Sequence, residues 1–337
     1  MDVVIAPHAA GSTMNDHGTT SGQMTSEAFR ALSIDDKLDW LAEHGEPADP
    51  RSDTDTRSLI RRFPHLADVV LSDVTIPRLA GRTLAARAYV DPTAEPSGAG
   101  LVWAHGGAFL GGHLDMPEAN WVSLELAASG VPVLSIDYTK CLRGVHYPVP
   151  SDDVMSAWEY AVREAETLLG VDAHSLYVGG ASAGATLAAS AVRRGSARPG
   201  MEPAGLVLVY PALHPNSFQP TQSLETVDDR TLEISINYAG SRAALKNPDA
   251  FPGLGDGTGF PDTLIVACEF DAMRPSAEEF HATLLAAGVN SHYRLELDSD
   301  HGHIDEPTHP GAVRTIAAIK DWIAGRLRLT TLGPTAP

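Results

Sequence analysis

The sequence predicts an α/β fold: a mostly parallel central sheet with helices on both faces and a helical cap. Five short runs are apolar along their whole length, as expected of strands buried on both faces. They span residues 100–104, 131–136, 175–178, 205–210 and 263–268. Helical segments lie between these runs, for example 152–169, where apolar residues recur on one helical face. Strands that alternate with helices indicate a parallel sheet covered on both sides.

Composition narrows the classes of partner and compartment. Lys and Arg number 24 against 43 for Asp and Glu, and the net charge of −19 has the wrong sign for binding nucleic acid or an anionic membrane. With only Cys141 and Cys268, no disulfide framework and no cysteine-based zinc cluster can form. Asp2 and Pro7 are atypical of an export signal. No stretch is apolar over the roughly 18 residues that a membrane span needs, and we expect a cytoplasmic protein.

Two segments do not fit the alternation of strands and helices. Residues 1–66 combine a polar stretch with a segment of helical periodicity, which predicts a mobile N-terminal arm and cap helices. The interval 211–262 is far longer than a crossover between two adjacent strands needs, and we interpret it as a cap insertion over the strand ends. The core comprises 67–210 and 263–330, and alternating apolar residues over 84–90 predict a half-buried strand within it.

The loop after the strand at 100–104 reads His-Gly-Gly-Ala-Phe-Leu-Gly-Gly. Residues without bulk let main-chain N–H groups approach an oxygen closely, as an oxyanion hole requires. The donors expected in such a hole are the N–H groups of Gly107, Ala108 and Ala183. His105 is expected to orient the loop rather than transfer protons. The alternative is a flexible glycine loop without chemistry.

A strand-to-helix turn with the sequence Gly180-Ala181-Ser182-Ala183-Gly184 follows the strand at 175–178. This G-x-S-x-G pattern is typical of a nucleophile elbow, where small residues allow a tight reversal that exposes the serine above a helix N-terminus. Ser182 is therefore the candidate nucleophile. A turn of small residues with no chemistry is the alternative, and the strand before it and the helix after it favour the functional interpretation.

Two further side chains follow successive strands and could complete a catalytic triad. Asp271 comes after the strand at 263–268, and His301 comes after a strand expected over 292–297. A serine needs a base, and folds of this type supply the partners in the order Ser, acid, His. Glu269 and Asp300 compete with Asp271 for the acid: Glu269 lies close to its strand, and Asp300 adjoins the histidine too tightly to aim at its ring.

A metal site is the alternative for this last turn. His301 and His303 stand two residues apart, and three aspartates at 298, 300 and 305 lie nearby. We favour the triad because Ser182 and the oxyanion loop already form a complete hydrolytic apparatus, so no metal and no other cofactor is expected. The expected substrate contacts are Phe109, Phe218, Leu224 and His303.

The chain resembles the hormone-sensitive lipase family of α/β-hydrolase carboxylesterases from about residue 100 to 322. The resemblance rests on His105-Gly106-Gly107-Ala108, Asp137-Tyr138, Tyr147-Pro148-Val149-Pro150, Asp153, Ala157-Trp158, the elbow around Ser182, Tyr210-Pro211, Asp271 and His301-Gly302. It implies the α/β-hydrolase fold, with Ser182 as nucleophile, His301 as base and Asp271 as the acid that orients it. It also implies a cap built from the N-terminal helices and the insertion. Since family members often pair edge strands, a homodimer is one assembly that the resemblance allows.

Three positions and one segment depart from the family pattern. Ala108 replaces a glycine, Ala181 replaces an aspartate, and His303 stands where an aromatic residue is usual. Residues 139–143 read Thr-Lys-Cys-Leu-Arg instead of Arg-Leu-Ala-Pro-Glu. The methyl group of Ala108 is expected to narrow the acyl site, and the altered segment lies near the cap.

These observations predict a serine hydrolase that cleaves small-molecule esters of short-to-medium acyl chains through a covalent acyl-enzyme. Amide hydrolysis, lactone opening or a tailoring acyl transfer on a natural product are alternatives on the same triad, because a fold does not determine the acyl acceptor. A ligand-binding protein without catalysis is a second alternative, as in the plant gibberellin receptors, which resemble this family but lack the catalytic histidine. His301 argues against it.

Overall fold

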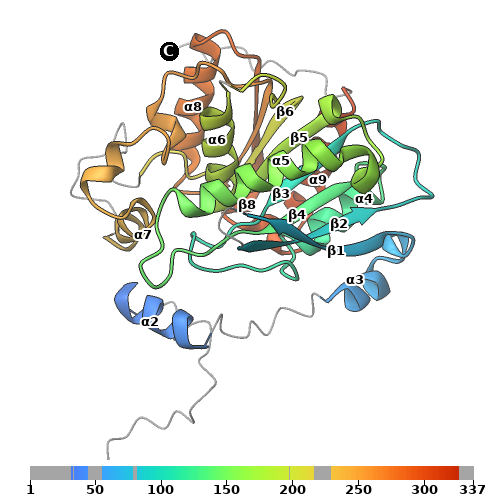
Figure 1. The fold of residues 1–337 in the computed structure, drawn as a ribbon, viewed down its shortest axis with the longest axis horizontal. Coiled ribbons are helices and arrows are strands. Elements are labelled where there is room, and N and C mark those ends of the chain that lie inside the picture. The colour runs from blue at the N-terminus through green and yellow to red at the C-terminus, as the bar shows by residue number, and fades with distance from the viewer. Residues whose placement is uncertain are drawn as a thin grey trace, which may run out of the picture.

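The computed structural model describes residues 32, 34–44, 55–78, 82–196, 198–215 and 229–325. Within these residues, eight strands form one sheet in the order β1-β2-β4-β3-β5-β6-β7-β8 (Figure 1). The strands are β1 (Val70–Pro77), β2 (Thr83–Val90), β3 (Gly100–Ala104), β4 (Val133–Asp137), β5 (Leu176–Ala181), β6 (Gly205–Val209), β7 (Thr263–Phe270) and β8 (Ser291–Asp300). Strands β3 to β8 pair in parallel, while β2 is antiparallel to both β1 and β4. The predicted mostly parallel sheet is therefore confirmed.

The helices follow the predicted alternation. They are α2 (Ile34–His44), α3 (Thr56–Arg62), α4 (Asn120–Ala127), α5 (Val149–Leu169), α6 (Ala183–Gly195), α7 (Asp229–Ala239), α8 (Arg274–Ala286) and α9 (Pro310–Ile323). Short 3₁₀ turns join them: η1 (Pro64–Leu66), η3 (Ala173–Ser175), η5 (Ala243–Lys246), η6 (Pro252–Leu254) and η7 (His303–Asp305). In the described part of the chain, no helix has the length and apolar character to cross a membrane.

Two apolar layers bury the sheet on both faces, because side chains of a strand alternate between its two sides. In β3, Leu101 and Trp103 belong to the layer that also contains apolar residues of α4 and α9. Val102 and Ala104 belong to the opposite layer, with residues of α5, α6 and α8. Strand β3 is therefore buried on both faces, as its uninterrupted apolar sequence predicts.

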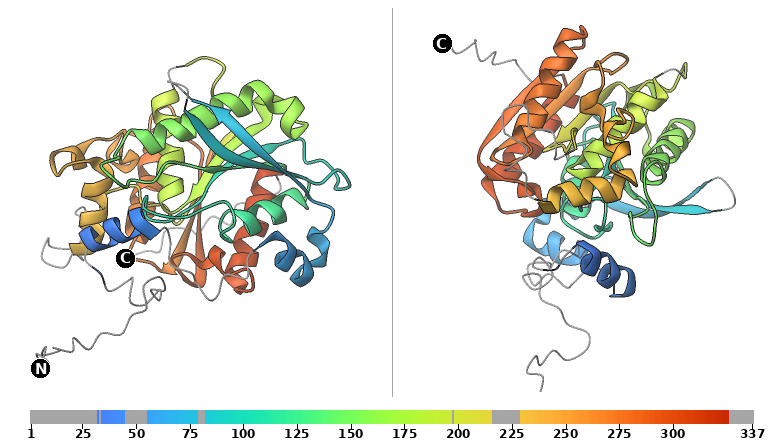
Figure 2. Two further views of the ribbon diagram at one scale, coloured as in Figure 1. Left: turned by 60° about the horizontal axis from the view of Figure 1, so that its bottom comes forward. Right: turned by 90° about the vertical axis from the view of Figure 1, so that its left-hand side faces the viewer.

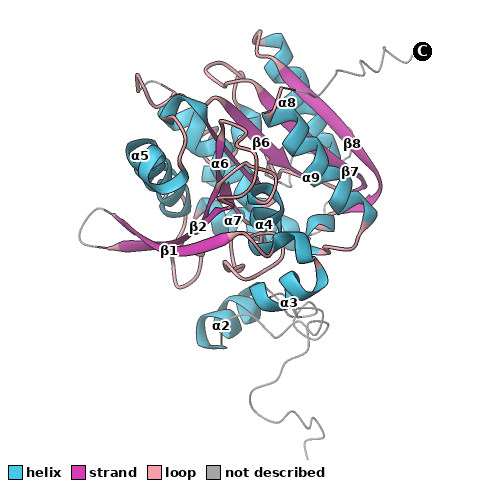
Figure 3. Cartoon of the chain, turned by 90° about the vertical axis from the view of Figure 1, so that its right-hand side faces the viewer, coloured by secondary structure: helices cyan, strands magenta, loops and turns pink. Residues whose placement is uncertain are grey.

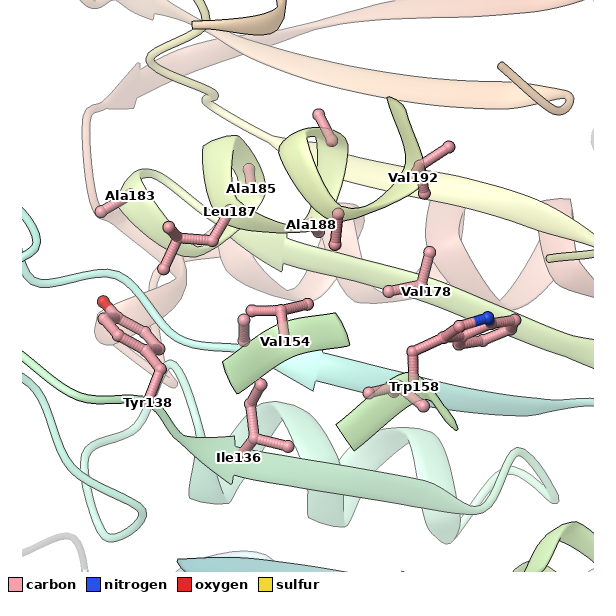
Figure 4. Close-up of a cluster of buried hydrophobic side chains, with 14 of the residues drawn as sticks. Ile136, Tyr138, Val154, Trp158, Val178, Ala183, Ala185, Leu187, Ala188 and Val192 are labelled. Carbon is pink, nitrogen blue, oxygen red and sulfur yellow. The ribbon is translucent and has the colours of Figure 1, made fainter. Parts of the chain in front are cut away.

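Small residues allow close packing in the layer that contains residues of α5, α6 and α8. Figure 4 shows Val154 and Trp158 of α5 beside Val178 of β5 and beside Ala188 and Val192 of α6. All five side chains are buried. At roughly 25 cal/mol per Å² of apolar surface removed from water, such layers provide most of the favourable free energy of folding. This packing fixes α6, whose N-terminus follows Ser182.

Strand β1 has no counterpart in the sequence-based prediction. It lies at the edge of the sheet, and most of its residues are exposed or half-buried, with Ile76 the one fully buried position. An edge strand of this kind carries no continuous apolar run, so its sequence lacks the signal that identified the buried strands.

The predicted cap segments lie on one side of the core. Helices α2 and α3 run along the same side of the molecule (Figures 1 and 3), and α2 packs against α7 of the insertion (Figure 2). The described part of the 211–262 insertion holds α7, η5 and η6. The predicted mobile arm lies outside the described residues.

Candidate active site

Ser182 sits at a strained turn between β5 and α6. Its φ of 50° and ψ of −118° lie where L residues are rarely found. A Cβ atom at Gly180 would lie 2.5 Å from the carbonyl oxygen of Ala104, and one at Gly184 would collide with the same oxygen. The N–H of Ser182 donates to the carbonyl oxygen of Val209 at 2.9 Å. The glycines two positions either side of Ser182 therefore let the elbow press against the end of β3.

Three of the predicted side chains form a hydrogen-bonded chain. Ser182 Oγ lies 2.9 Å from His301 Nε2, and His301 Nδ1 lies 2.8 Å from Asp271 Oδ2. The second carboxylate oxygen of Asp271 accepts from the N–H of Met273 at 2.8 Å. Because the carboxylate can only accept, Nδ1 carries the proton and Nε2 is free to accept from the serine hydroxyl. This geometry is that of an activated nucleophile with an oriented base.

The electrostatic environment favours a positive charge on His301. Burial acts to lower the pKa of His301, but the hydrogen bond that it donates to Asp271 and the negative charges of Asp271 and Glu118 raise it above the usual value. The Asp271 side chain is 3% exposed and the His301 side chain 39% exposed. The base is thus reachable from solvent, while its carboxylate partner is shielded.

The two competing carboxylates have other contacts. Glu269 accepts a hydrogen bond from the N–H of Asp298 at 2.9 Å. Asp300 lies opposite Phe270 across the bulge between β7 and β8. Neither has a hydrogen bond to His301 among the described residues, and Asp271 is the carboxylate that contacts the ring.

The loop after β3 is also strained. Ala108 and Phe109 both have positive φ, 54° and 64°, and a Cβ at Gly107 would collide with the backbone of Gly111. Over the described ranges, the N–H groups of Gly107, Ala108 and Ala183 donate no backbone hydrogen bond. Ala108 and Ala183 line the pocket that contains Ser182, whereas Gly107 does not. Unpaired N–H groups beside a nucleophile are suited to stabilise an oxyanion.

His105 is buried behind this loop. Its Nδ1 donates to the carbonyl oxygen of Gly106 at 2.6 Å, and its Nε2 accepts from Lys140 Nζ at 3.3 Å. The ring stacks on Tyr138, with 4.7 Å between ring centroids. Burial and the charge of Lys140 lower the pKa of His105. These contacts agree with the expectation that a neutral His105 orients the loop.

A cavity of about 310 Å³ opens at Ser182. The loop and the turns of the sheet contribute one side, and the insertion contributes Ala212, His214, Ile234, Ser235 and Phe251. Phe109, an expected substrate contact, lines the cavity and stacks on Tyr238 of α7, with 3.9 Å between ring centroids. Phe270 also lines it and is 61% exposed. A second cavity, of about 280 Å³, lies beside Trp158 and does not include Ser182 among its lining residues.

His303 does not contact this cavity, contrary to the sequence-based expectation. It is 4% exposed, and its two ring nitrogens lie 3.2 Å from Cys268 Sγ and 2.8 Å from Thr315 Oγ1. Burial, with the charge of His309, lowers the pKa of His303 to about 4. The chain turns at Gly302, so the two histidines point in different directions. The expected contacts Phe218 and Leu224 lie outside the described residues.

The alternative interpretation, a metal site, would require several ligand side chains close together. In the part of the chain that the structure describes, no three His, Cys, Asp or Glu side chains are grouped so that they could hold a metal ion. His301 and His303 direct their nitrogens to different partners, as described above.

Two residues that sequence reasoning did not single out for the site connect its loop to its base: Glu118 contacts the loop and Tyr210 contacts His301. Glu118 is buried and accepts a hydrogen bond from the N–H of Gly106, and Tyr210 donates its hydroxyl to Glu118. The ring of Tyr210 lies 4.8 Å from that of His301. A glutamate just before a helix is ordinarily an exposed acidic residue near the helix N-terminus, so its sequence gives no signal of burial.

Comparison with known proteins gives one consistent result. A family model described as the alpha/beta hydrolase fold matches residues 101–305. The ethyl acetate hydrolase of Pseudomonas putida is 29% identical over 271 residues, covering 75% of this chain and 83% of that protein. Esterase LipW of Mycobacterium marinum superposes with a TM-score of 0.67 at 26% identity, covering 90% of this chain and 98% of the other. An esterase of Pyrobaculum calidifontis has a TM-score of 0.68 at 23% identity, covering 82% and 95%.

Proposed function

Since this chain belongs to the α/β hydrolase fold family, we propose that it hydrolyses esters of short-to-medium carboxylic acids through Ser182, His301 and Asp271. The resemblance to the carboxylesterases of this family is confirmed, as are the α/β-hydrolase fold and the assignment to hydrolase enzymes. The observation that carries the triad is the unbroken hydrogen-bonded chain from Ser182 Oγ through the His301 ring to Asp271.

The reaction follows from these contacts. Ser182 Oγ attacks the ester carbonyl carbon while His301 Nε2 takes the hydroxyl proton, and Asp271 stabilises the resulting imidazolium. The carbonyl oxygen becomes an oxyanion that accepts hydrogen bonds from the N–H groups of the loop and of Ala183. Collapse of the tetrahedral intermediate expels the alcohol, which takes the proton from His301. Water then attacks the acyl-enzyme by the same steps, releasing the acid and restoring Ser182.

The shape of the cavity supports the preference for short chains. Its volume of about 310 Å³ lies at the lower end of the range for small-molecule sites. Phe109 and Phe251 line the cavity, and Tyr238 packs against both of these rings. The ethyl acetate hydrolase similar to this chain is named for a short-chain ester. We therefore propose acetate to butyrate esters as the best substrates.

A series of nitrophenyl esters from acetate to palmitate tests the proposal. Ser182→Ala should lower kcat by about 10⁶, since Ser182 supplies the hydroxyl that contacts His301 Nε2. Ser196→Ala is the matched control, because Ser196 lies just after α6 and away from the Ser182 cavity, and it should leave kcat unchanged. Substantial activity in Ser182→Ala, or faster turnover of palmitate than of butyrate, would contradict the proposal.

A further inference from the structure

Glu118 lies at the centre of a buried polar cluster between β3 and α4. It is 4% exposed, and its Oε2 accepts from the N–H of Gly106 at 2.5 Å while its Oε1 accepts from the Tyr210 hydroxyl. Its own N–H donates to Asp305 at 3.2 Å, and its carbonyl oxygen accepts from the indole of Trp103 at 2.8 Å. Three segments, at 103–106, at Tyr210 and at Asp305, therefore meet at one glutamate.

Burial of the Glu118 carboxylate is unfavourable for the stability of the fold. Among the described residues, no Lys or Arg forms an ion pair with Glu118. Burial and the nearby charge of Asp305 raise the pKa of Glu118 to about 7. A buried carboxylate without a cationic partner destabilises a fold unless its hydrogen bonds compensate.

One end of Glu118 fixes the start of the oxyanion loop. The carbonyl oxygen of Gly106 accepts hydrogen bonds from His105 and from the Tyr138 hydroxyl, the latter at 3.0 Å. The N–H of the same residue is held by Glu118. A Cβ at Gly106 would collide with the Glu118 carboxylate, so the close approach requires glycine. The two peptide units on either side of Gly106, which lead into Gly107 and Ala108, are thus both held by hydrogen bonds.

The other end of Glu118 fixes the support of the base. Tyr210 has a φ of 36°, and its N–H donates to Val266 at 2.7 Å. Its ring packs against both histidines of the last turn, with centroid distances of 4.8 Å to His301 and 5.3 Å to His303. The hydroxyl bond to Glu118 holds this ring in place beneath His301.

We propose that Glu118 is a positioning residue for hydrolysis, holding the Gly106 peptide and the Tyr210 ring so that the oxyanion donors and His301 face the same carbonyl group. The inference rests on the proposed ester hydrolysis. Glu118 itself lines no part of the Ser182 cavity, so it acts through these two neighbours rather than on the substrate.

Glu118 also affects the ionisation of His301. The groups around Glu118 are Asp305 of η7, Tyr210 after β6, His301 after β8 and Cys268 of β7. When ionised, Glu118 favours the protonated form of His301 and contributes to its raised pKa. A neutral replacement removes that charge, so the pKa of His301 falls and the acid limb of the kcat/KM profile moves to lower pH.

Three variants separate these effects. Glu118→Ala should lower kcat by about 10- to 100-fold with little change in KM, because both positioned groups are released. Glu118→Gln keeps the shape and one acceptor oxygen, and it should lower kcat less and move the acid limb to lower pH. Tyr210→Phe keeps the Gly106 contact and should give a smaller loss than Glu118→Ala. Glu125→Gln, on the helix α4 that follows Glu118, is the matched control and should match the unmodified protein.

Titration of His301 by NMR in the unmodified protein and in Glu118→Gln provides a readout without substrate. We expect a lower His301 pKa in the variant. Unchanged kcat in all three variants would overturn the positioning role, and an unchanged His301 pKa with Glu118→Gln would overturn the effect of the Glu118 charge on His301. Failure of the proposed function is distinguished from this result, because it would appear as ester turnover that survives Ser182→Ala.

Discussion

The candidate site is built from two regions: turns at the ends of the strands, and residues of the 211–262 insertion. Its floor consists of the turns after β3, β5, β7 and β8, which carry loop 105–112, Ser182, Asp271 and His301. Its wall consists of the pocket-lining residues of the insertion: Ala212, His214, Ile234, Ser235 and Phe251. The floor follows hydrogen-bonded parallel strands whose carboxyl ends meet at one edge. The wall is not part of the sheet, and it is held against the core by side-chain contacts and by a hydrogen bond from the N–H of Tyr147 to the carbonyl oxygen of Tyr238 at 2.7 Å.

The contacts between the wall and the core illustrate how the two regions differ. Tyr238 of α7 stacks on Phe109 and packs against Phe251, and Asn237 donates to the carbonyl oxygen of Cys141 at 2.8 Å. By contrast, Ser182 is tied by its own backbone to the carbonyl oxygen of Val209. We therefore expect substitutions in the floor to remove the chemistry, and substitutions at the wall to change which ester is accepted.

The largest difference in kcat is expected between substitutions of His301 and of His303, the two histidines that follow β8. His301→Ala should lower kcat by several orders of magnitude, because among the described residues His301 is the base that contacts Ser182 Oγ. His303→Ala should leave kcat within a few-fold and instead lower the melting temperature, since it removes buried bonds to Cys268 and Thr315. Kinetics and thermal unfolding of both variants distinguish the roles. Equal losses of kcat in the two variants would contradict the assignment of the floor.

An intermediate effect should appear on acidification. The raised pKa of His301 means that its Nε2 becomes protonated, and unable to accept the serine proton, at a pH above the usual value of about 6.5. Activity should then fall about tenfold for each pH unit below that pKa. Because the titrating group belongs to the floor, acetate and butyrate esters should show the same acid limb in kcat/KM. A limb that moves with acyl length would show that the wall controls the ionisation.

The smallest effect is expected at Ala108, a residue of the floor loop 105–112. Ala108 lines the cavity and has a positive φ of 54°. Ala108→Gly should relieve the backbone strain and remove a methyl group, shifting kcat/KM toward longer acyl chains by up to about tenfold. The butyrate-to-acetate ratio measures this shift. A fall in kcat for all esters alike would mean that Ala108 matters for the floor rather than for selectivity.

The same division explains what the sequence could predict. The elbow around Ser182 and the glycine-rich loop are local patterns between strands that are apolar along their whole length, and such patterns can be interpreted without the fold. Asp271 and His301 follow from the order of strands along the chain. The predicted role of His303 was wrong because spacing within a turn does not determine the direction of a ring. Glu118 was missed because its partners Gly106, Tyr210 and Asp305 are brought together only by the sheet.

Direct detection of the acyl-enzyme tests most directly that the floor carries out covalent chemistry. The unmodified protein would be acid-quenched during turnover of nitrophenyl acetate, digested, and its peptides located by mass spectrometry. We predict an acetyl group on Ser182, formed in a burst of one nitrophenol per active site and absent from Ser182→Ala. Turnover with no acetyl group on Ser182, or with acetylation at another residue that persists in Ser182→Ala, would contradict the account.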